Sequence, residues 1–315
     1  MEDKSRNALK PGTELEGYRF DRVLGAGRIG VTYLATELLL DRKVAIKEFL
    51  PAYMATREAD GLSVSPPSRM DAEEFEWMRE RFRYEAQALV AVRHPNIVSV
   101  QHFFETNGTG YLVMEFVDGQ PLDALVPPGT ILYEEEIREV FDPLLDGLQA
   151  VHDRVMHGHP FLHQDIEPEH IVIRRDGTPV LIDFGAAREA ILHGFATEYY
   201  SWSLPTKEGY KPYEQYGGDG DLGPWSDIYS VGAVLYYCVA GKRPIAAPQR
   251  FGASFRGERD PLSVAADAAD GNFSPALLHA IDRALAVREA ERPQSVRELR
   301  ELMTPTGLVA PATGT

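Results

Sequence analysis

Three glycines lie close together near the start of the chain, at Gly25, Gly27 and Gly30. Glycine lets a backbone approach phosphate groups closely and offers them unhindered N–H donors. Here the glycines join two predicted strands instead of opening a helix, which argues against a dinucleotide-binding turn. A phosphate-binding turn and an ordinary hairpin turn both fit this short segment, so its interpretation depends on the residues that accompany it.

Lys47 ends a predicted strand twenty-two residues after Gly25. A lysine on an inner strand face can hold phosphate oxygens, although a single lysine is more often a solvated charge. Glu85 lies on the apolar face of a helix predicted for residues 73–92, where an acid needs a cationic partner to offset its desolvation. Lys47 is the partner that we expect, and a position at the edge of the helix face is the simpler alternative.

A further predicted strand, at residues 111–116, ends in a flexible linker that contains Asp118 and Gly119. A strand that leaves into such a linker would expose the carbonyl and N–H groups of Glu115 and Val117. These groups are suited to hydrogen bonds with a planar heterocycle such as adenine.

Two carboxylates, Asp165 and Asp183, follow eighteen residues apart. Asp165 lies on a predicted loop after a long helix at residues 134–151. Asp183 follows the apolar strand of residues 180–182 and precedes Phe184 and a glycine. The pattern therefore places each carboxylate on a loop that follows a regular element.

The order of the predicted elements divides the chain into a β-rich first part and a helical second part. Prolines and a glycine mark a loop insertion at residues 51–70. These patterns predict an α+β fold with a small antiparallel β lobe plus one helix, and a large, mainly α-helical lobe. The predicted parts are a flexible N-terminus (1–14), the small lobe with its insertion (15–117), the large lobe (118–303) and a flexible tail (304–315).

Composition excludes several functional classes for this chain of 315 residues. Its net charge of −16 argues against nucleic acid and anionic membrane as partners, since both would be repelled. No apolar run approaches the roughly 18–20 residues that span a bilayer, and the first residues lack the apolar core of a signal peptide. Cys238 is the single cysteine, so no intramolecular disulfide can form. We therefore expect a cytoplasmic protein with no membrane segment in this chain.

Taken in order, these motifs resemble the signature set of serine/threonine protein kinases of the bacterial type. The resemblance extends from about Tyr18 to Met303 and implies a two-lobed protein-kinase-like fold. Further matching segments are residues 209–215, 225–232 and 291–293. By analogy with the family, Arg292 pairs with Glu214, and Asp227 anchors the catalytic loop.

The resemblance also implies a function, which is ATP-dependent phosphoryl transfer to serine or threonine of a protein substrate, with Mg²⁺ or Mn²⁺ as the metal. Asp165 is implied to take the proton of the attacking hydroxyl, and Asp183 to hold the metal between the phosphates. The implied phosphate-binding residues are Gly25, Gly27, Gly30 and Lys47, the last supported by Glu85. Those implied around adenine are Leu24, Val31, Ala45, Met114, Glu115, Val117 and Val172.

Glu167 departs from the family pattern, which has a lysine near the transferring phosphate at this position. A carboxylate there should repel the γ-phosphate. At about 4 Å, two unit charges interact by roughly 4 kcal/mol at an effective dielectric constant near 20. Losing an attraction and gaining a repulsion predicts a loss of several decades in rate.

His170 is a second departure, because the family has at this position an asparagine that ligates a metal ion. Imidazole is a poor ligand for Mg²⁺ and a better one for Mn²⁺ or Zn²⁺. Either the second metal is lost or the metal preference shifts. The simpler alternative is a histidine that only hydrogen-bonds Asp165 or a backbone group.

Lys207 is a third departure, since the family usually has a threonine here that contacts the catalytic aspartate and lysine. We expect an ion pair between Glu167 and Lys207 that rebuilds this junction with reversed charge. Two alternatives are that Lys207 neutralises the phosphate in place of the missing lysine, or that the pair seals the peptide-substrate site. An alignment that shifts Thr206 into the threonine position remains open. Two functions follow: a kinase with weakened or metal-shifted activity, or a pseudokinase that binds nucleotide or a regulatory partner without transfer.

Overall fold

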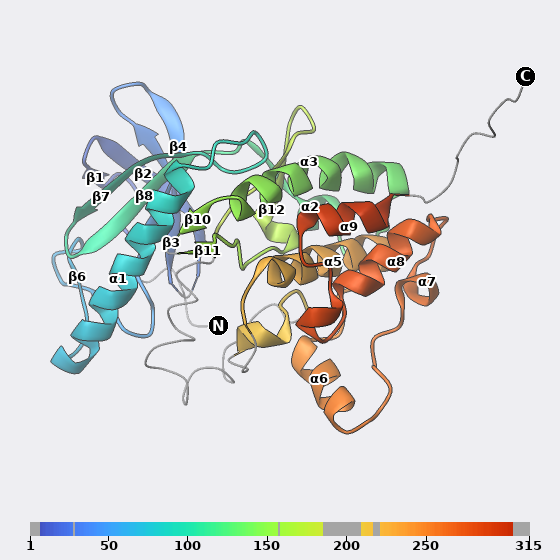
Figure 1. Cartoon of the computed structure of the whole chain (residues 1–315). Helices are drawn as coiled ribbons and strands as arrows, with labels where there is room; N and C mark the ends of the chain where they lie inside the picture. Colours follow the sequence, from blue (N-terminus) through green and yellow to red (C-terminus); the bar gives the residue numbers. More distant parts are fainter. Residues whose placement is uncertain (1–6, 28, 157, 185–208, 217–220, 305–315) are drawn as a thin grey trace, which may run out of the picture.

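The computed structural model describes residues 7–27, 29–156, 158–184, 209–216 and 221–304 (Figure 1). An antiparallel sheet with the strand order β1-β2-β3-β4-β8-β7 forms the small lobe. Its strands are β1 (Glu14–Leu15), β2 (Tyr18–Ala26), β3 (Gly30–Glu37), β4 (Arg42–Phe49), β7 (Val100–Thr106) and β8 (Thr109–Glu115). The glycine-rich segment is thus the turn between β2 and β3, and Lys47 lies on the central strand β4.

Helix α1 (Arg69–Val90) packs against β7 and β8. Its apolar positions recur at steps of three and four, and this stripe is buried against the sheet. Phe82 stacks on Phe49 of β4 with 5.6 Å between the ring centroids. The helix begins four residues earlier than the pattern predicts, because the Ser68 side chain accepts a hydrogen bond from the Asp71 N–H and caps it. Glu85 therefore faces β4, on the buried side of the helix.

The large lobe is mainly helical, as expected. Its helices are α2 (Leu122–Leu125), α3 (Glu134–His152), α5 (Pro224–Ala240), α6 (Ala247–Phe255), α7 (Ala265–Ala268), α8 (Pro275–Ala284) and α9 (Val296–Met303). Its short strands are β9 (Gly119–Pro121), β10 (Val155–Met156), β11 (His159–Pro160), β12 (Ile171–Arg174) and β13 (Pro179–Leu181), and its 3₁₀ turns are η1 (Pro168–His170), η3 (Tyr213–Tyr216) and η4 (Glu289–Glu291).

Helix α5 is the centre of this lobe, and α3, α7, α8 and α9 pack around it (Figure 1). It is buried almost throughout, as its apolar sequence predicts. A glycine lets it approach α8 closely, since a Cβ atom at Gly232 would lie 2.6 Å from the Ala284 Cβ. Cys238 of α5 is fully buried, and burial raises its pKa to about 12.

The insertion at residues 51–70 contains the short hairpin β5 (Thr56–Arg57) and β6 (Val64–Ser65). Arg57 enters the small lobe, where it lies 2.6 Å from the buried Glu48 carboxylate. Tyr33 and Tyr111 also donate hydrogen bonds to Glu48. The Leu9 N–H donates to the Tyr33 hydroxyl, and the Leu9 side chain is buried. Part of the N-terminal segment expected to be flexible is therefore packed against the sheet.

The predicted α+β architecture, with an antiparallel small lobe and a helical large lobe, is confirmed. The exact bounds of the lobes, insertion and tails remain predictions. Among the residues that the structure describes, no helix has the length and apolar character needed to cross a membrane.

We predict that Arg57→Met destabilises the small lobe by about 3 kcal/mol, because it leaves the Glu48 carboxylate buried without its cation. Chemical denaturation followed by circular dichroism measures the loss. The double variant Glu48→Gln/Arg57→Met should recover part of it, since the unpaired charge is then gone. Arg42→Met is the matched control, because the pair of Arg42 with Glu37 lies at the surface and contributes less than about 1 kcal/mol. Equal losses in Arg57→Met and Arg42→Met would contradict the argument.

Candidate active site between the lobes

Asp227, at the start of α5, holds the loop that carries Asp165. Its two carboxylate oxygens accept hydrogen bonds from the His163 N–H at 2.8 Å and the Gln164 N–H at 2.7 Å. His152 adds a third contact, with its Nε2 2.9 Å from Asp227. The contact expected between Asp227 and the catalytic loop is thus present. Gln164 has a φ of 64°, a region that non-glycine residues rarely adopt, so the loop depends on these outside contacts.

His163 joins this loop to the segment of Asp183. Its Nδ1 accepts a hydrogen bond from the Asp165 N–H, so its Nε2 carries the proton and donates to the Ile182 carbonyl at 3.1 Å. Its ring lies 4.3 Å from the Phe184 ring, centroid to centroid. Burial lowers the pKa of His163 to about 4, so the side chain is neutral at physiological pH and serves as a fixed connector.

Lys47 reaches across from β4 to the large lobe. Its Nζ lies 2.6 Å from the Asp183 Oδ1 and 3.8 Å from the Glu85 Oε1. The expected contact with Glu85 is present, and Asp183 is the nearer carboxylate. Burial opposes the charge of Lys47, yet these two carboxylates keep its pKa above its ordinary value. Burial would likewise raise the pKa of Asp183, but Lys47 and His170 hold it below its usual range.

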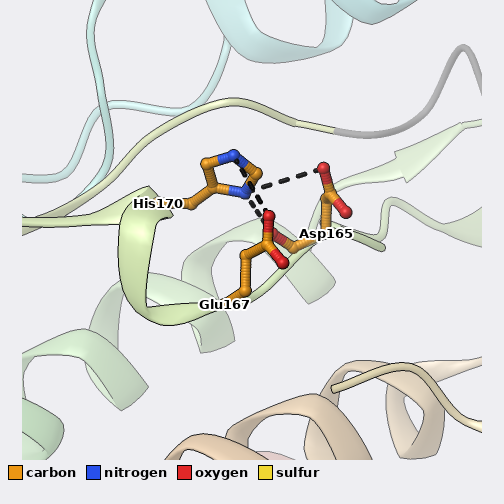
Figure 2. A group of neighbouring side chains, drawn as sticks. All are labelled: Asp165, Glu167 and His170. Carbon is orange, nitrogen blue, oxygen red and sulfur yellow. Dashed lines mark hydrogen bonds and ion pairs between the residues drawn. The ribbon is translucent and has the colours of Figure 1, made fainter. Parts of the chain in front are cut away.

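His170 lies within a group of carboxyl side chains that includes Asp165 and Glu167 (Figure 2). Its Nδ1 is 2.7 Å from the Asp165 carbonyl oxygen, so the backbone hydrogen bond of the simpler expectation is present. Its Nε2 lies 3.6 Å from the Glu167 Oε1 and 3.5 Å from the Asp183 Oδ2. Burial lowers the pKa of His170, but the surrounding carboxylates outweigh it and raise the pKa above its ordinary value.

Glu167 lies in surroundings that oppose its ionisation. Burial, a hydrogen bond with Glu169 and the charge of Asp165 raise its pKa to about 8. The repulsion expected from its carboxylate stays a prediction. The predicted ion pair with Lys207 lies outside the described residues.

The segment of residues 209–216 brings a second lysine into the site. The Lys211 Nζ lies 3.1 Å from the Asp165 Oδ1, and its side chain is buried. The segment is held by the expected pair of Glu214 and Arg292, with two close contacts of 2.6 and 3.1 Å. Sequence reasoning missed the role of Lys211. The available signal was a lysine three residues before the buried Glu214, in a motif whose neighbours are apolar.

The three glycines differ in whether the surrounding structure leaves room for a side chain. A Cβ atom at Gly30 would lie 2.0 Å from the Glu48 carbonyl oxygen, so the approach of β3 to β4 demands glycine there. A Cβ atom at Gly25 would meet nothing within 4 Å, and one at Gly27 only the Gly30 oxygen at 3.7 Å. Packing thus requires a glycine only at Gly30. It does not explain Gly25 and Gly27, whose role would lie in the turn itself.

The residues expected around adenine come from both lobes. Ala45 and Met114 are cross-strand partners on β4 and β8. The others lie on β2 (Leu24), on β3 (Val31), at and beyond the end of β8 (Glu115 and Val117) and on β12 (Val172). One expectation is wrong: the Glu115 N–H does not face a ligand, because it donates to the Ser99 carbonyl at 2.9 Å.

A family model described as "Protein kinase domain" matches residues 18–302. The chain therefore belongs to the protein kinase family, as its motifs indicated.

Individual relatives of this chain are also named as protein kinases. Serine/threonine-protein kinase PknA of Nostoc sp. is 31% identical over 299 residues, which cover 91% of this chain and 46% of the relative. Serine/threonine-protein kinase pkn2 of Myxococcus xanthus is 30% identical over 293 residues, with coverages of 91% and 32%. The chain thus spans less than half the length of these relatives.

Solved structures show the same fold. The structure described as "PpkA-294 apo form" is 32% identical and has a TM-score of 0.79. The match covers 95% of this chain and 100% of that one. The kinase domain of Mycobacterium tuberculosis PknI, at 23% identity and a TM-score of 0.64, supports the fold alone; the match covers 94% of this chain and 98% of that one.

We predict that Asp227→Asn destabilises the protein by about 2 kcal/mol at pH 7, because it replaces one of the two oxygens that accept buried N–H groups with a donor and removes the charge. Burial would raise the pKa of Asp227, but its contacts with His152 and His163 hold it below its ordinary value. A depressed folded-state pKa gives stability that is complete above about pH 4 and is lost as the pH falls through that pKa.

Urea unfolding at pH 7 and pH 3 tests this sign. The difference between wild type and Asp227→Asn should shrink at pH 3, where the wild-type carboxylate loses its advantage. Asp146→Asn is the control, since Asp146 pairs with Arg300 at the surface. A difference that stays constant between the two pH values would show that Asp227 does not act through its charge.

Proposed function

We propose that the chain transfers the γ-phosphoryl group of ATP to serine or threonine of a protein substrate. The observation that carries the proposal is the contact of Lys47 with both Asp183 and Glu85, which links β4 and α1 of the small lobe to the Asp183 loop. In kinases this lysine–glutamate pair and the metal-binding aspartate must both be in place for transfer. The names of the relatives, all serine/threonine-protein kinases, support the acceptor class.

In the proposed reaction, the substrate hydroxyl oxygen bonds to the γ-phosphorus while the bond from that phosphorus to the ADP oxygen breaks. The hydroxyl proton passes to the Asp165 carboxylate. Asp227 fixes the backbone just before Asp165 through the His163 and Gln164 N–H groups, which orients the carboxylate. The contribution of the chain is then chiefly positioning and charge.

The residues present fit a divalent cation with mixed nitrogen and oxygen ligands. Asp165, Glu167 and His170 each offer a ligand atom, and these atoms lie within 4.8 Å of one another. The Asp183 Oδ2 also lies 3.5 Å from the His170 Nε2. We infer that Asp183 and His170 are the main ligands and that the imidazole shifts the preference from Mg²⁺ toward Mn²⁺. Such an ion neutralises charge on the phosphates. The chain itself holds His170 in position through the Asp165 carbonyl oxygen.

A protein partner fits the segment at residues 209–216, which resembles the end of a kinase activation segment. The net charge of −16 disfavours nucleic acid as a partner. We place the activity in the cytoplasm, where the buried single Cys238 would stay reduced.

A pseudokinase is the second candidate function. It is favoured by the substitutions Glu167 and His170 and by the ion pair of Lys211 with Asp165, which engages the carboxylate that the kinase reaction needs as its proton acceptor. In that case the chain would bind nucleotide or a regulatory partner and would signal through its conformation, without phosphoryl transfer. Restoring the family residues separates the candidates: transfer that appears only in Glu167→Lys/His170→Asn would identify a kinase that has lost its activity.

We predict that wild type phosphorylates itself or casein from labelled ATP, and that Asp165→Asn lowers the rate at least about 100-fold, because the proton acceptor is lost. Asp153→Asn is the matched control, since Asp153 lies at the exposed end of α3. Absence of transfer from wild type with both Mg²⁺ and Mn²⁺ would refute the proposed function and favour the binding module.

We further predict that wild type is faster with Mn²⁺ than with Mg²⁺ and that His170→Asn lowers this ratio about tenfold, because an amide oxygen suits Mg²⁺ better than imidazole does. Initial rates at matched metal concentrations measure the ratio. His159→Asn, an exposed substitution on β11, should leave the ratio unchanged. An unchanged ratio in His170→Asn would remove His170 from the metal site.

A further inference from the structure

Lys211 is a buried lysine whose charged end meets the catalytic loop. Its Nζ lies 3.1 Å from the Asp165 Oδ1, and 9% of its side chain is exposed. A lysine side chain loses rotamer freedom and hydration when it is held in this way, so an ion pair with a carboxylate is needed to offset the cost. Neither the motifs nor the comparisons assign a role to this residue.

The backbone that carries Lys211 is held at several points. Glu214 binds Arg292 and accepts a hydrogen bond from the Ser226 hydroxyl at 2.8 Å. The Gln215 side chain donates to the Gln164 carbonyl at 3.1 Å, directly beside Asp165. The position of Lys211 relative to the loop is therefore set by contacts that do not involve its own charge.

Gly209 fixes the other end of the segment. Its φ is 109°, and a Cβ atom there would lie 2.5 Å from the Pro244 carbonyl oxygen, so only glycine fits. Tyr210, the next residue, is buried. Lys211 thus extends from a backbone that is fixed on both sides.

The charge of the site explains why a lysine is needed there. Asp165, Glu167, Glu169 and Asp183 all lie within 4 Å of His170. Lys47 pairs with Asp183, on the side of the small lobe. Within the described residues, Lys211 is the lysine whose Nζ pairs with Asp165. A triphosphate entering this site would add further negative charge beside that carboxylate.

We propose that Lys211 supplies the positive charge beside Asp165 that acts on the transferring phosphoryl group. This inference rests on the proposed function. Lys211 replaces, from a different segment, the loop lysine whose place Glu167 occupies. It balances the charge that develops on the γ-phosphoryl oxygens while Asp165 takes the hydroxyl proton. Glu167 cannot supply this positive charge. Its buried side chain instead contacts His170.

The test compares the full chain with Lys211→Met, Lys211→Arg and the exchange variant Glu167→Lys/Lys211→Met. Lys242→Met is the matched control, because Lys242 is exposed just after α5. Two readouts are taken: kcat and KM for transfer to casein, and the affinities for ADP and for a non-hydrolysable ATP analogue with Mn²⁺. The second readout needs no turnover. Thermal melting confirms that each variant is folded.

We expect Lys211→Met to lower kcat about 100-fold with little change in KM for casein. It should also abolish the preference for the triphosphate analogue over ADP, with ADP affinity unchanged. Lys211→Arg should keep most of the preference, because its charge is retained, and the exchange variant should recover part of it. If Lys211→Met fails to fold, the arginine and exchange variants still decide the matter through the same preference.

Each outcome separates the two proposals. A preference that Lys211→Met leaves intact, or a kcat that rises in this variant, overturns the inference, and the rise would mark the pair with Asp165 as inhibitory. If the wild type performs no transfer but Lys211→Met abolishes the triphosphate preference, the proposed function is refuted, and Lys211 is left as a residue that binds the γ-phosphate without a role in transfer. A chain that binds neither nucleotide would overturn both.

Discussion

The site depends on one fully buried carboxylate, that of Asp227 at the start of α5. A buried charge is costly unless it is hydrogen-bonded on every side. Asp227 meets that condition by accepting the N–H groups of His163 and Gln164 and contacting His152. Because α5 is packed on all sides, the constraint passes from the core of the large lobe directly to the backbone that precedes Asp165.

The same constraint reaches the second aspartate through His163. Its backbone is held by Asp227, while its ring donates to the Ile182 carbonyl and contacts Phe184. Asp183, which lies between those two residues, has a φ of 60° and is thus held in a strained conformation. A neutral, buried histidine is suited to this task, because it bonds in a fixed tautomer and adds no charge. The two aspartates are therefore positioned by one connected set of contacts.

Local pattern was sufficient for the two-lobed architecture and for contacts that family motifs specify, such as Arg292 with Glu214. It did not predict the hairpin β5–β6 or helix α6, and it does not show where burial alters the chemistry. Glu167 reads as a charged carboxylate in the sequence, but its burial among other acids raises its pKa to about 8. Lys211 reads as a surface lysine, and its contact with Asp165 joins residues forty-six positions apart. Neither periodicity nor spacing encodes which carboxylate a distant lysine will meet.

Two lysines balance the charge of the two aspartates, and each lysine pairs with a different one. Lys47 comes from the small lobe and pairs with Asp183, whereas Lys211 comes from the large lobe and pairs with Asp165. The two pairs lie on either side of His170, whose Nδ1 is 3.6 Å from the Asp165 Oδ2 and whose Nε2 is 3.5 Å from the Asp183 Oδ2. In the proposed reaction, a nucleotide with its cation would offer the same charges in another arrangement, so its binding would exchange partners instead of burying new unpaired charge. That exchange would be less costly than desolvating free ions, because the side chains of Lys47, Lys211 and Asp165 are already largely removed from water, whereas that of Asp183 is 37% exposed. Under the proposed role of Lys211, the departure at Glu167 would be compatible with phosphate binding, because the positive charge would come from a second segment.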